Sequence, residues 1–427
     1  MRRLLVLFAT LAATSLPALA TTPISVTHES GVTVVTQADP SASLVGVELA
    51  IPAGLNRQQL SQSGLAALTA ESILRTQVSG VPLDEAIEAR GGSARYTVEP
   101  TGVRFYVEAL AVDAPAVFDA FATALSAPDF SGATVTAARD ALIRRVESEQ
   151  QEPLAVGVEM LDLAQAGGNN TGMPMFGTPG SLVQLAPANV SAFYRAFYRR
   201  GGASISAAGR VDALGARTIA RLVAVLPQGA TPVVKTRVQG LTSSHRELVA
   251  RRDVNAPWLV VQYAAPSVTS TDYGPMLVLA AFLRRTLGDI AEVPGTISPT
   301  AASGAVGALY NYDSSQSSLV LYVDGSIGEP NHTFSTALSV VNILSATRLE
   351  GSIEQFKRIA AGDFTIGAST LEARARLGGI FARRTGSADY LDATLRAISA
   401  TTPADLQRVA RRYLGRPTIA LVLPRSG

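Results

Sequence analysis

Few side chains in this sequence of 427 residues have the types and spacing that catalysis or metal binding requires. The three histidines, His28, His245 and His332, lie far apart and form no i,i+4 pair, so we interpret them as surface or capping residues. The sequence has no cysteine, which excludes disulfides and thiolate metal sites. It also lacks the motifs G-x-S-x-G, G-x-x-x-x-G-K-[ST] and G-x-G-x-x-G after a strand, so nucleophilic and nucleotide-dependent reactions have no starting residue.

Carboxylates gather in one place, at Glu147, Glu149 and Glu152 near the end of an expected helix. Such a group could bind a metal ion or exchange protons. Charges clustered on a helix are more often a solvated face, and we predict a solvated face here.

The segment at residues 64–76, GLAALTAESILRT, has the pattern of a short buried helix. Ser61 and Ser63 could cap it, and apolar residues recur at helical spacing. Positions 67 and 71 lie one turn apart on one face, where a metal-binding helix would hold two ligands. Here they are Ala67 and Glu71, so this face offers one carboxylate and no imidazole.

The first twenty residues have the pattern of a cleavable export signal. Arg2 and Arg3 precede an apolar run ending at Leu16, and small residues lead to a cleavage site predicted after Ala20. The run is shorter than the ~20 residues of a membrane-spanning helix, and no later stretch is long enough. We therefore expect a periplasmic or secreted protein with no membrane span after cleavage.

The charge balance gives little support to nucleic-acid binding. Loss of Arg2 and Arg3 lowers the 36 basic residues to 34, which equals the 34 acidic residues. The mature chain is then neutral and has no basic face for nucleic acid.

The rest of the chain repeats one order of elements. In the first half, apolar alternation predicts strands near Val26 and at 31–37, 43–54, 103–110 and 203–211. Helical patterns occupy 64–76, 82–89, 113–126, 134–152 and 187–200. The second half has predicted strands at 246–253, 257–266 and 317–325, helices at 274–286, 332–345 and 353–382, and a helix and strand within 401–424. Such a repeat of roughly 200 residues predicts two copies of one unit.

The predicted fold class is accordingly α+β, with two homologous domains, each a largely antiparallel sheet covered by helices. After the signal peptide at 1–20, we place the N-terminal domain at 21–226 and the C-terminal domain at 245–427. The linker at 227–244 is rich in Pro, Gly, Gln, Ser and Thr.

Several segments, taken in order, resemble the insulinase, pitrilysin and mitochondrial processing peptidase family. They are IPAG at 51–54, the segment 64–76, GG at 91–92, APDF at 127–130, and GTPGSLVQLAPANVSAFYRAFY at 177–198. Active members of this family resemble inverted zincins, with H-x-x-E-H on the helix after the IPAG-like strand and a distal glutamate as third zinc ligand. Two imidazoles and a carboxylate hold zinc there, and the helical glutamate activates water.

Carried onto this sequence, the resemblance predicts a degenerate site with no catalytic and no metal-binding residues. The first histidine falls on Ala67, the glutamate base on Ala70 and the second histidine on Glu71. The third ligand falls on Arg145, and Glu147 is two residues out of register. One carboxylate cannot make a useful zinc site, so we expect no cofactor in this chain.

The resemblance implies a non-catalytic subunit of a periplasmic heteromeric metallopeptidase, which helps to bind extended peptides and closes a chamber with a zinc-bearing partner. In such subunits an Arg and a Tyr beside a glycine-containing loop can face substrate. The counterpart here is the loop 288–307, and the candidate substrate-binding residues are Arg284, Arg285, Tyr310 and Tyr312.

Two alternatives stay open on the sequence. The chain could be a periplasmic peptide-binding or scaffolding protein with no role in proteolysis. It could also be an active metallopeptidase with unrecognised ligands.

Overall fold

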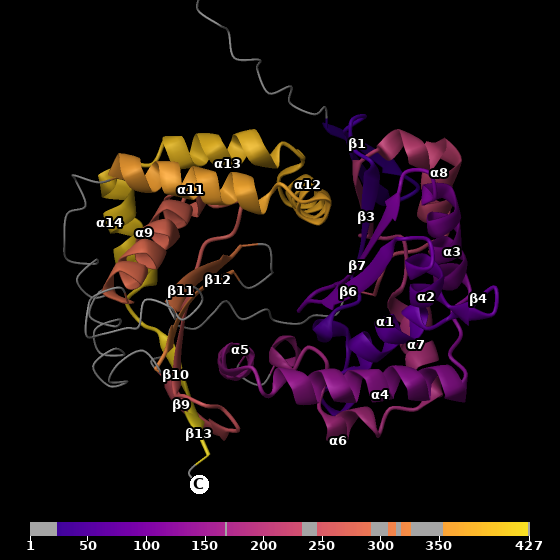
Figure 1. Ribbon diagram of the computed structural model, residues 1–427, viewed down its shortest axis with the longest axis horizontal. Helices are drawn as coiled ribbons and strands as arrows, with labels where there is room; N and C mark the ends of the chain where they lie inside the picture. The colour runs from indigo at the N-terminus through magenta and orange to yellow at the C-terminus, as the bar shows by residue number, and fades with distance from the viewer. Residues whose placement is uncertain are drawn as a thin grey trace, which may run out of the picture.

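The computed structural model describes residues 24–166, 169–232, 246–291, 306–312, 317–325 and 353–425. Its strands form two main sheets that follow chain order (Figure 1). The predicted helix at 332–345 and most of the predicted loop at 288–307 lie outside the described residues.

The N-terminal sheet has the strand order β1-β2-β8-β3-β7-β6. Its strands are β1 (Ile24–Glu29), β2 (Val32–Ala38), β3 (Leu44–Ile51), β6 (Ser93–Val98), β7 (Val103–Leu110) and β8 (Ser204–Gly209). All pairs are antiparallel except β2 with β8. Strand β6 is therefore an edge, and alternate backbone groups of an edge strand lack a partner within the sheet.

The C-terminal sheet repeats this arrangement without a counterpart of β1. Its order, from one edge, is β9-β13-β10-β12-β11, with only β9 and β13 parallel. The strands are β9 (Arg246–Arg252), β10 (Trp258–Ala264), β11 (Val306–Asn311), β12 (Ser318–Asp324) and β13 (Thr418–Pro424). The matching orders confirm the predicted fold class of two similar α+β units.

Helices cover each sheet. In the N-terminal half they are α1 (Leu65–Leu74), α2 (Leu83–Glu88), α3 (Ala114–Ser126), α4 (Gly132–Glu149), α5 (Pro153–Gln165), α6 (Pro179–Leu182), α7 (Pro187–Phe197) and α8 (Gly215–Ala224). In the C-terminal half they are α9 (Tyr273–Ala291), α11 (Ile353–Gly367), α12 (Leu371–Thr385), α13 (Tyr390–Ser399) and α14 (Pro403–Tyr413). A small hairpin, β4 (Gln77–Val78) and β5 (Val81–Pro82), follows α1. No helix in these described ranges is long and apolar enough to cross a membrane.

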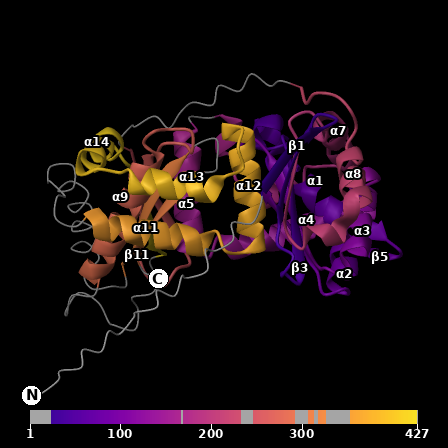
Figure 2. The same ribbon diagram turned by 90° about the horizontal axis from the view of Figure 1, so that it is seen from above.

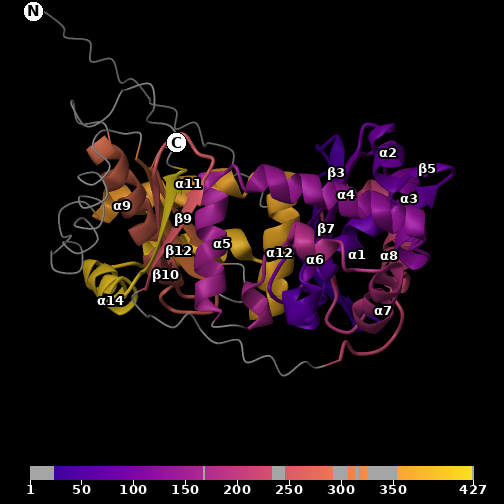
Figure 3. The same ribbon diagram turned by 90° about the horizontal axis from the view of Figure 1, so that it is seen from below.

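Two helices cross to the other half of the molecule. Helix α5 packs on β10 and β13 of the C-terminal sheet, and α12 packs on β2, β3 and β8 of the N-terminal sheet. Figures 1, 2 and 3 show both helices between the two halves. The sequence left 153–165 unassigned and predicted one helix over 353–382. The structure instead breaks that segment before Thr370, whose hydroxyl accepts from Ala373 N and caps α12.

Helix α1 is buried as its composition predicts. Its N-cap, Gly64, has φ +91°, and a Cβ there would come within 2.8 Å of Leu182 Cδ2 and 2.9 Å of the Phe176 carbonyl oxygen. Inside the helix, the Thr69 and Ser72 hydroxyls donate to carbonyls one turn earlier at 2.8 and 2.7 Å. These bonds satisfy polar side chains that the core surrounds on every side.

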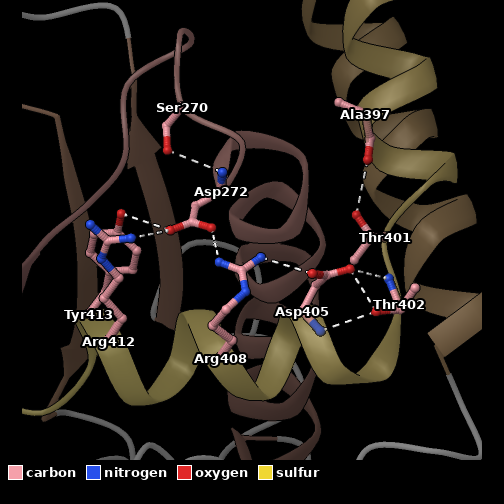
Figure 4. Close-up of polar contacts among 9 residues, drawn as sticks. All are labelled: Ser270, Asp272, Ala397, Thr401, Thr402, Asp405, Arg408, Arg412 and Tyr413. Atoms are coloured by element: carbon pink, nitrogen blue, oxygen red, sulfur yellow. Dashed lines mark hydrogen bonds and ion pairs between the residues drawn. The ribbon is translucent and has the colours of Figure 1, made fainter.

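Asp272 organises a charged cluster in the C-terminal half (Figure 4). Its carboxylate, 1% exposed, accepts hydrogen bonds from Arg408, from Arg412 Nη1 at 3.1 Å and from the Tyr413 hydroxyl at 3.1 Å. Arg408 also pairs with Asp405 at 2.8 Å. Because each partner comes from α14 and Asp272 precedes α9, we interpret this cluster as a structural tie between the two helices.

Candidate functional site

The α1 positions that align with the metal-binding motif offer neither a histidine ligand nor a free carboxylate. Ala67 and Ala70 are fully buried and belong to the apolar core of the N-terminal half. The side chain of Glu71 is 15% exposed, and its Oε1 forms an ion pair with Arg75 Nε at 2.8 Å. The single carboxylate on this face is therefore already neutralised by a cation one turn away.

Arg145 places a guanidinium where the aligned zinc ligand would be a carboxylate. The group lies 3.7 Å from the centroid of the Phe176 ring, and its Nε donates to Glu149 Oε1 at 3.1 Å. Its side chain is 45% exposed. A cation held over an aromatic face and by a carboxylate is stably positioned, while its outer edge stays accessible.

Tyr96 on the edge strand β6 completes this group. Its ring packs edge-on against Phe176 at 6.5 Å between centroids. The residue is only 7% exposed, and its buried hydroxyl lies near the Glu71 carboxylate. Burial first, and then the nearby Glu71 carboxylate, raises the pKa of the Tyr96 hydroxyl, whereas Arg145 lowers it. The hydroxyl therefore keeps its proton and stays a donor.

Tyr96, Arg145 and Phe176 line a cavity of about 560 Å³, and all of its lining residues belong to the N-terminal half. Its walls come from β6, the end of α4, α5 and residues 171–176. Apolar side chains also line it, among them Leu55, Val98, Leu154, Val158 and Met173. This volume and mixed lining are typical of ligand sites in proteins.

Four carboxylates line the cavity. They are Glu149 at the end of α4, Glu152 just before α5, and Glu159 and Asp162 on α5. Burial raises the pKa of Asp162, whose Oδ1 accepts a 3.0 Å hydrogen bond from Gln262 Nε2. Burial and, next, Glu149 raise the pKa of Glu159. Glu147 and Glu152 are exposed and Glu149 is half-buried, as the predicted solvated face requires.

The residues present do not fit zinc. No three His, Cys, Asp or Glu side chains among the described residues come together in a way that could hold a metal ion. Around the aligned position the side chains are two alanines, one ion-paired glutamate and an arginine. A guanidinium repels a metal cation, so the side chains at this position disfavour zinc binding.

The second set of predicted site residues lies in the C-terminal half. Arg284, Tyr310 and Tyr312 line a smaller cavity of about 180 Å³, and Arg284 pairs with Asp363 of α11. The Tyr310 hydroxyl donates to the Pro266 carbonyl, and its ring packs 5.3 Å from that of Tyr312.

Arg285 follows Arg284 on α9, which continues to Ala291. The start of the predicted loop at 288–307 is thus helical, and Tyr310 belongs to strand β11. A role in binding substrate stays a prediction for these four residues.

Sequence reasoning missed Tyr96 and Phe176. On the sequence Tyr96 lies in a segment with no predicted strand, although the structure makes it part of β6, and Phe176 lies in a Gly-, Pro- and Met-rich stretch. The signal that could have pointed to them is their position between GG at 91–92 and GTPG at 177–180, both of which carry the family resemblance.

Comparisons with known proteins agree with this geometry. Residues 33–179 match the sequence profile of Insulinase (Peptidase family M16). An uncharacterized zinc protease of Mycobacterium tuberculosis is 23% identical over 428 residues, covering 96% of this chain and 95% of the relative.

Solved structures share the fold along the whole described chain. The peptidase M16 inactive domain from Pseudomonas fluorescens has a TM-score of 0.78 at 15% identity and covers 95% of this chain and 98% of that one. A protease from Helicobacter pylori has 0.77 at 14%, with 95% and 100% covered. A chain of complex III2 from Candida albicans has 0.73 at 15%, with 94% and 96% covered. The profile match over residues 33–179 and the shared fold show that this chain is similar to the insulinase family of peptidases, although its sequence lacks H-x-x-E-H.

Proposed function

We propose that this protein is a non-catalytic, peptide-binding subunit that works with a zinc-bearing member of the same family in an exported compartment. The observation that carries the proposal is the contrast between the two parts of the site. The aligned metal position has Ala67, Ala70 and Arg145 in place of ligands, while the cavity beside it has an edge strand in its wall.

Strand β6 supports the peptide-binding part. It is the last strand of its sheet, and Tyr96, Thr97 and Val98 line the cavity. An extended peptide can add to such an edge through backbone hydrogen bonds and place alternate side chains in the cavity. Backbone pairing is tolerant of sequence, which suits a subunit that presents many peptides to a separate catalytic chain.

The proposal of a zinc-bearing partner is supported by the names of similar proteins. The family relative from Mycobacterium tuberculosis is named a zinc protease, and the solved Pseudomonas fluorescens domain is described as inactive. A chain without ligands contributes to proteolysis only if another chain brings the zinc. We propose that this partner carries an intact H-x-x-E-H motif and that the two chains enclose the peptide between them.

The test is a reconstitution. The purified chain alone should contain no stoichiometric zinc and should cleave no peptide, and a secreted relative with H-x-x-E-H should cleave peptides faster when both are present. A matched control adds an equal amount of the unfolded chain. If the relative is equally active without this chain, the proposal is wrong.

A scaffolding role is the second candidate, because the fold is shared with a chain of complex III2. In that case the protein should form a self-paired dimer that ignores the zinc-bearing relative. The third candidate, an active metallopeptidase, requires one bound zinc that a chelator removes together with activity. Zinc analysis by mass spectrometry and size-exclusion chromatography separate these outcomes.

A further inference from the structure

We infer that Met175 is an oxidation site at the mouth of the cavity of about 560 Å³, and that its conversion to the sulfoxide weakens the binding of peptides there. The inference rests on the proposed peptide-binding function and adds a way to regulate it. The oxidant is a peroxide, which a protein in the proposed exported compartment meets without the reducing systems of the cytosol.

Three methionine side chains gather around Phe176. Met173 and Met175 line the cavity of about 560 Å³, and Met160 of α5 shares with Met175 the lining of a second cavity of about 70 Å³. Met276 of α9, by contrast, is fully buried in the core of the C-terminal half. Because the sequence has no cysteine, methionine is the residue type through which an oxidant acts on sulfur in this chain.

Met175 is the most exposed of these methionines. Its exposed fraction is 40%, whereas Met160 is half-buried and Met173 is 7% exposed. Oxidation of a side chain depends on its access to the oxidant. We therefore expect Met175 to react first, followed by Met160 and Met173, with Met276 last.

A turn holds Met175 in this position. Gly177 N donates to the Pro174 carbonyl oxygen at 3.0 Å, so Met175 and Phe176 are the two central residues of the turn. The Phe176 side chain is 5% exposed and belongs to the core of the N-terminal half. Gly177 has φ +79°, and a Cβ there would come within 2.8 Å of the Ser63 carbonyl oxygen. The turn is thus packed against the start of α1, and it presents Met175 at the exposed edge of the cavity.

Methionine suits a surface that binds peptides of varied sequence. Its unbranched side chain and polarizable sulfur adapt to apolar groups of different shape. Met173 and Met175 line the cavity together with Thr97 and Val98 of the edge strand β6. A peptide paired with β6 turns alternate side chains toward this wall. An apolar side chain of the peptide then packs on Met175.

Oxidation adds one oxygen atom to the Met175 sulfur. A sulfur lone pair attacks one oxygen of hydrogen peroxide, so that an S–O bond forms while the O–O bond breaks. Sulfur gives up two electrons, and the second oxygen leaves as hydroxide and takes the proton of the transferred oxygen to form water. The sulfoxide is polar, and an apolar peptide side chain that covers its oxygen leaves this acceptor without a partner. Peptide binding therefore weakens.

Peroxide treatment of the full chain, followed by peptide mapping with mass spectrometry, tests the site. In the folded chain Met175 should be oxidised about tenfold faster than Met276. Treatment in urea is the matched control, because every methionine is then accessible and the rates should converge. Equal rates for Met175 and Met276 in the folded chain, or faster oxidation of Met160 or Met173, would overturn the assignment.

Peptide affinity before and after the same treatment tests the effect. The probes are fluorescent dodecapeptides of mixed composition with an acetylated N-terminus and an amidated C-terminus, and the tightest binder of the wild-type chain is used throughout. Oxidation of Met175 should weaken binding about fivefold. Methionine sulfoxide reductases of both stereospecificities, added together, should restore the affinity. Circular dichroism before and after treatment shows whether the chain stays folded.

Two substitutions assign the effect to one residue. Met175→Leu has no sulfur at this position, so peroxide should leave the affinity of this variant where it was before treatment. Met276→Leu removes the buried methionine instead, and peroxide should weaken its binding as much as that of the wild type. A Met175→Leu chain that still loses affinity on oxidation would overturn the inference.

Failure of the proposed function gives a different result. A chain that binds no peptide before oxidation refutes peptide binding, and with it the effect assigned to Met175. A chain that binds peptide, and keeps its affinity after Met175 is oxidised, retains the proposed function and refutes this inference alone.

Discussion

Each half of the molecule lends one helix to the sheet of the other half, and the two contacts differ in chemistry. Helix α5 sets Leu161 against Val260, Val320 and Ala420 in an apolar cluster on the C-terminal sheet. Helix α12 also packs Ala375 and Ala382 on apolar side chains of the N-terminal sheet, but it adds several polar contacts to them. Its contacts and those of the adjacent α13 include Glu372 with Arg95, Arg374 with Asp39, Arg383 with Ser204 and Tyr390 with Gln37.

The difference indicates that the α5 contact holds the two halves together, whereas the strength of the α12 contact can change with salt and pH. Apolar burial is non-directional and changes little with salt or with the protonation of side chains. Charge pairs need specific geometry, and salt weakens those that are exposed. Arg95 lies on β6, so the adjustable contact also touches the strand proposed to bind peptide.

The two helices also approach their sheets to different extents. A Cβ added to Gly157 of α5 would lie 2.5 Å from Val260 Cγ2 and 3.0 Å from Val260 Cβ. A Cβ added to Gly378 of α12 would meet nothing closer than Val35 Cγ1 at 3.3 Å. The apolar contact is therefore tight, and the charged contact has room for a methyl group with small shifts.

The first prediction uses this pair of glycines. Gly157→Ala should lower the free energy of unfolding by about 1–3 kcal/mol, because the stiff Val260 side chain must move. Gly378→Ala should be within about 0.5 kcal/mol of the wild type, since helix propensity favours alanine and offsets the slight crowding. Urea unfolding of both variants measures the difference. Equal losses would show that the two contacts are equally close.

The second prediction concerns Glu48, which is buried under α12. Its Oε2 pairs with Arg104 Nη1 at 3.2 Å, and its Oε1 has no partner. Burial raises the pKa of the Glu48 carboxyl above the usual 4.5, although Arg104, Arg383 and Arg376 act against this. The folded state thus holds this proton more tightly than the unfolded state, and the stability that the proton provides is lost as pH rises above 4.5.

Glu48→Gln removes this titration. The unfolding free energy of the wild type should therefore fall relative to that of the variant as pH increases from 4 to 8. Urea unfolding of both proteins across this range is the measurement. A wild type that gains on the variant with rising pH would mean that the three arginines outweigh the burial.

The contrast between the helices also explains what sequence could predict. The helix at 64–76 and most strands follow apolar patterns within one domain, and the structure has them where expected, whereas strands β6 and β11 were not predicted. Helix α12 carries Glu372, Arg374 and Arg383, which on the sequence indicate an exposed surface. Their partners lie in the other half, far away in the chain. A local sequence pattern cannot predict contacts between residues so far apart in the sequence.

The candidate site divides in the same way. Ala67, Glu71 and Arg145 could be located because the resemblance fixes their register. The cavity could not be predicted, since α5, β6 and residues 171–176 meet only once α5 has crossed to the C-terminal sheet. Tyr96 belongs to the site because β6 holds its ring against Phe176, which is a property of the folded chain.

The last prediction tests the exposed end of the α12 contact and has the smallest expected effect. Arg95 pairs with Glu372 through two hydrogen bonds, one of them 3.1 Å long, and their side chains are 50% and 41% exposed. Glu372→Gln should lower the unfolding free energy by about 0.2–1 kcal/mol at low salt.

At about 1 M salt, where the screening length is about 3 Å, this loss should shrink. The loss in Gly157→Ala should stay constant over the same range, because it arises from packing against Val260. Chemical unfolding at several salt concentrations with urea, which is uncharged, separates the two responses. If salt changed both losses equally, the charged and apolar contacts would not be distinct, and ionic strength could not tune β6 through α12.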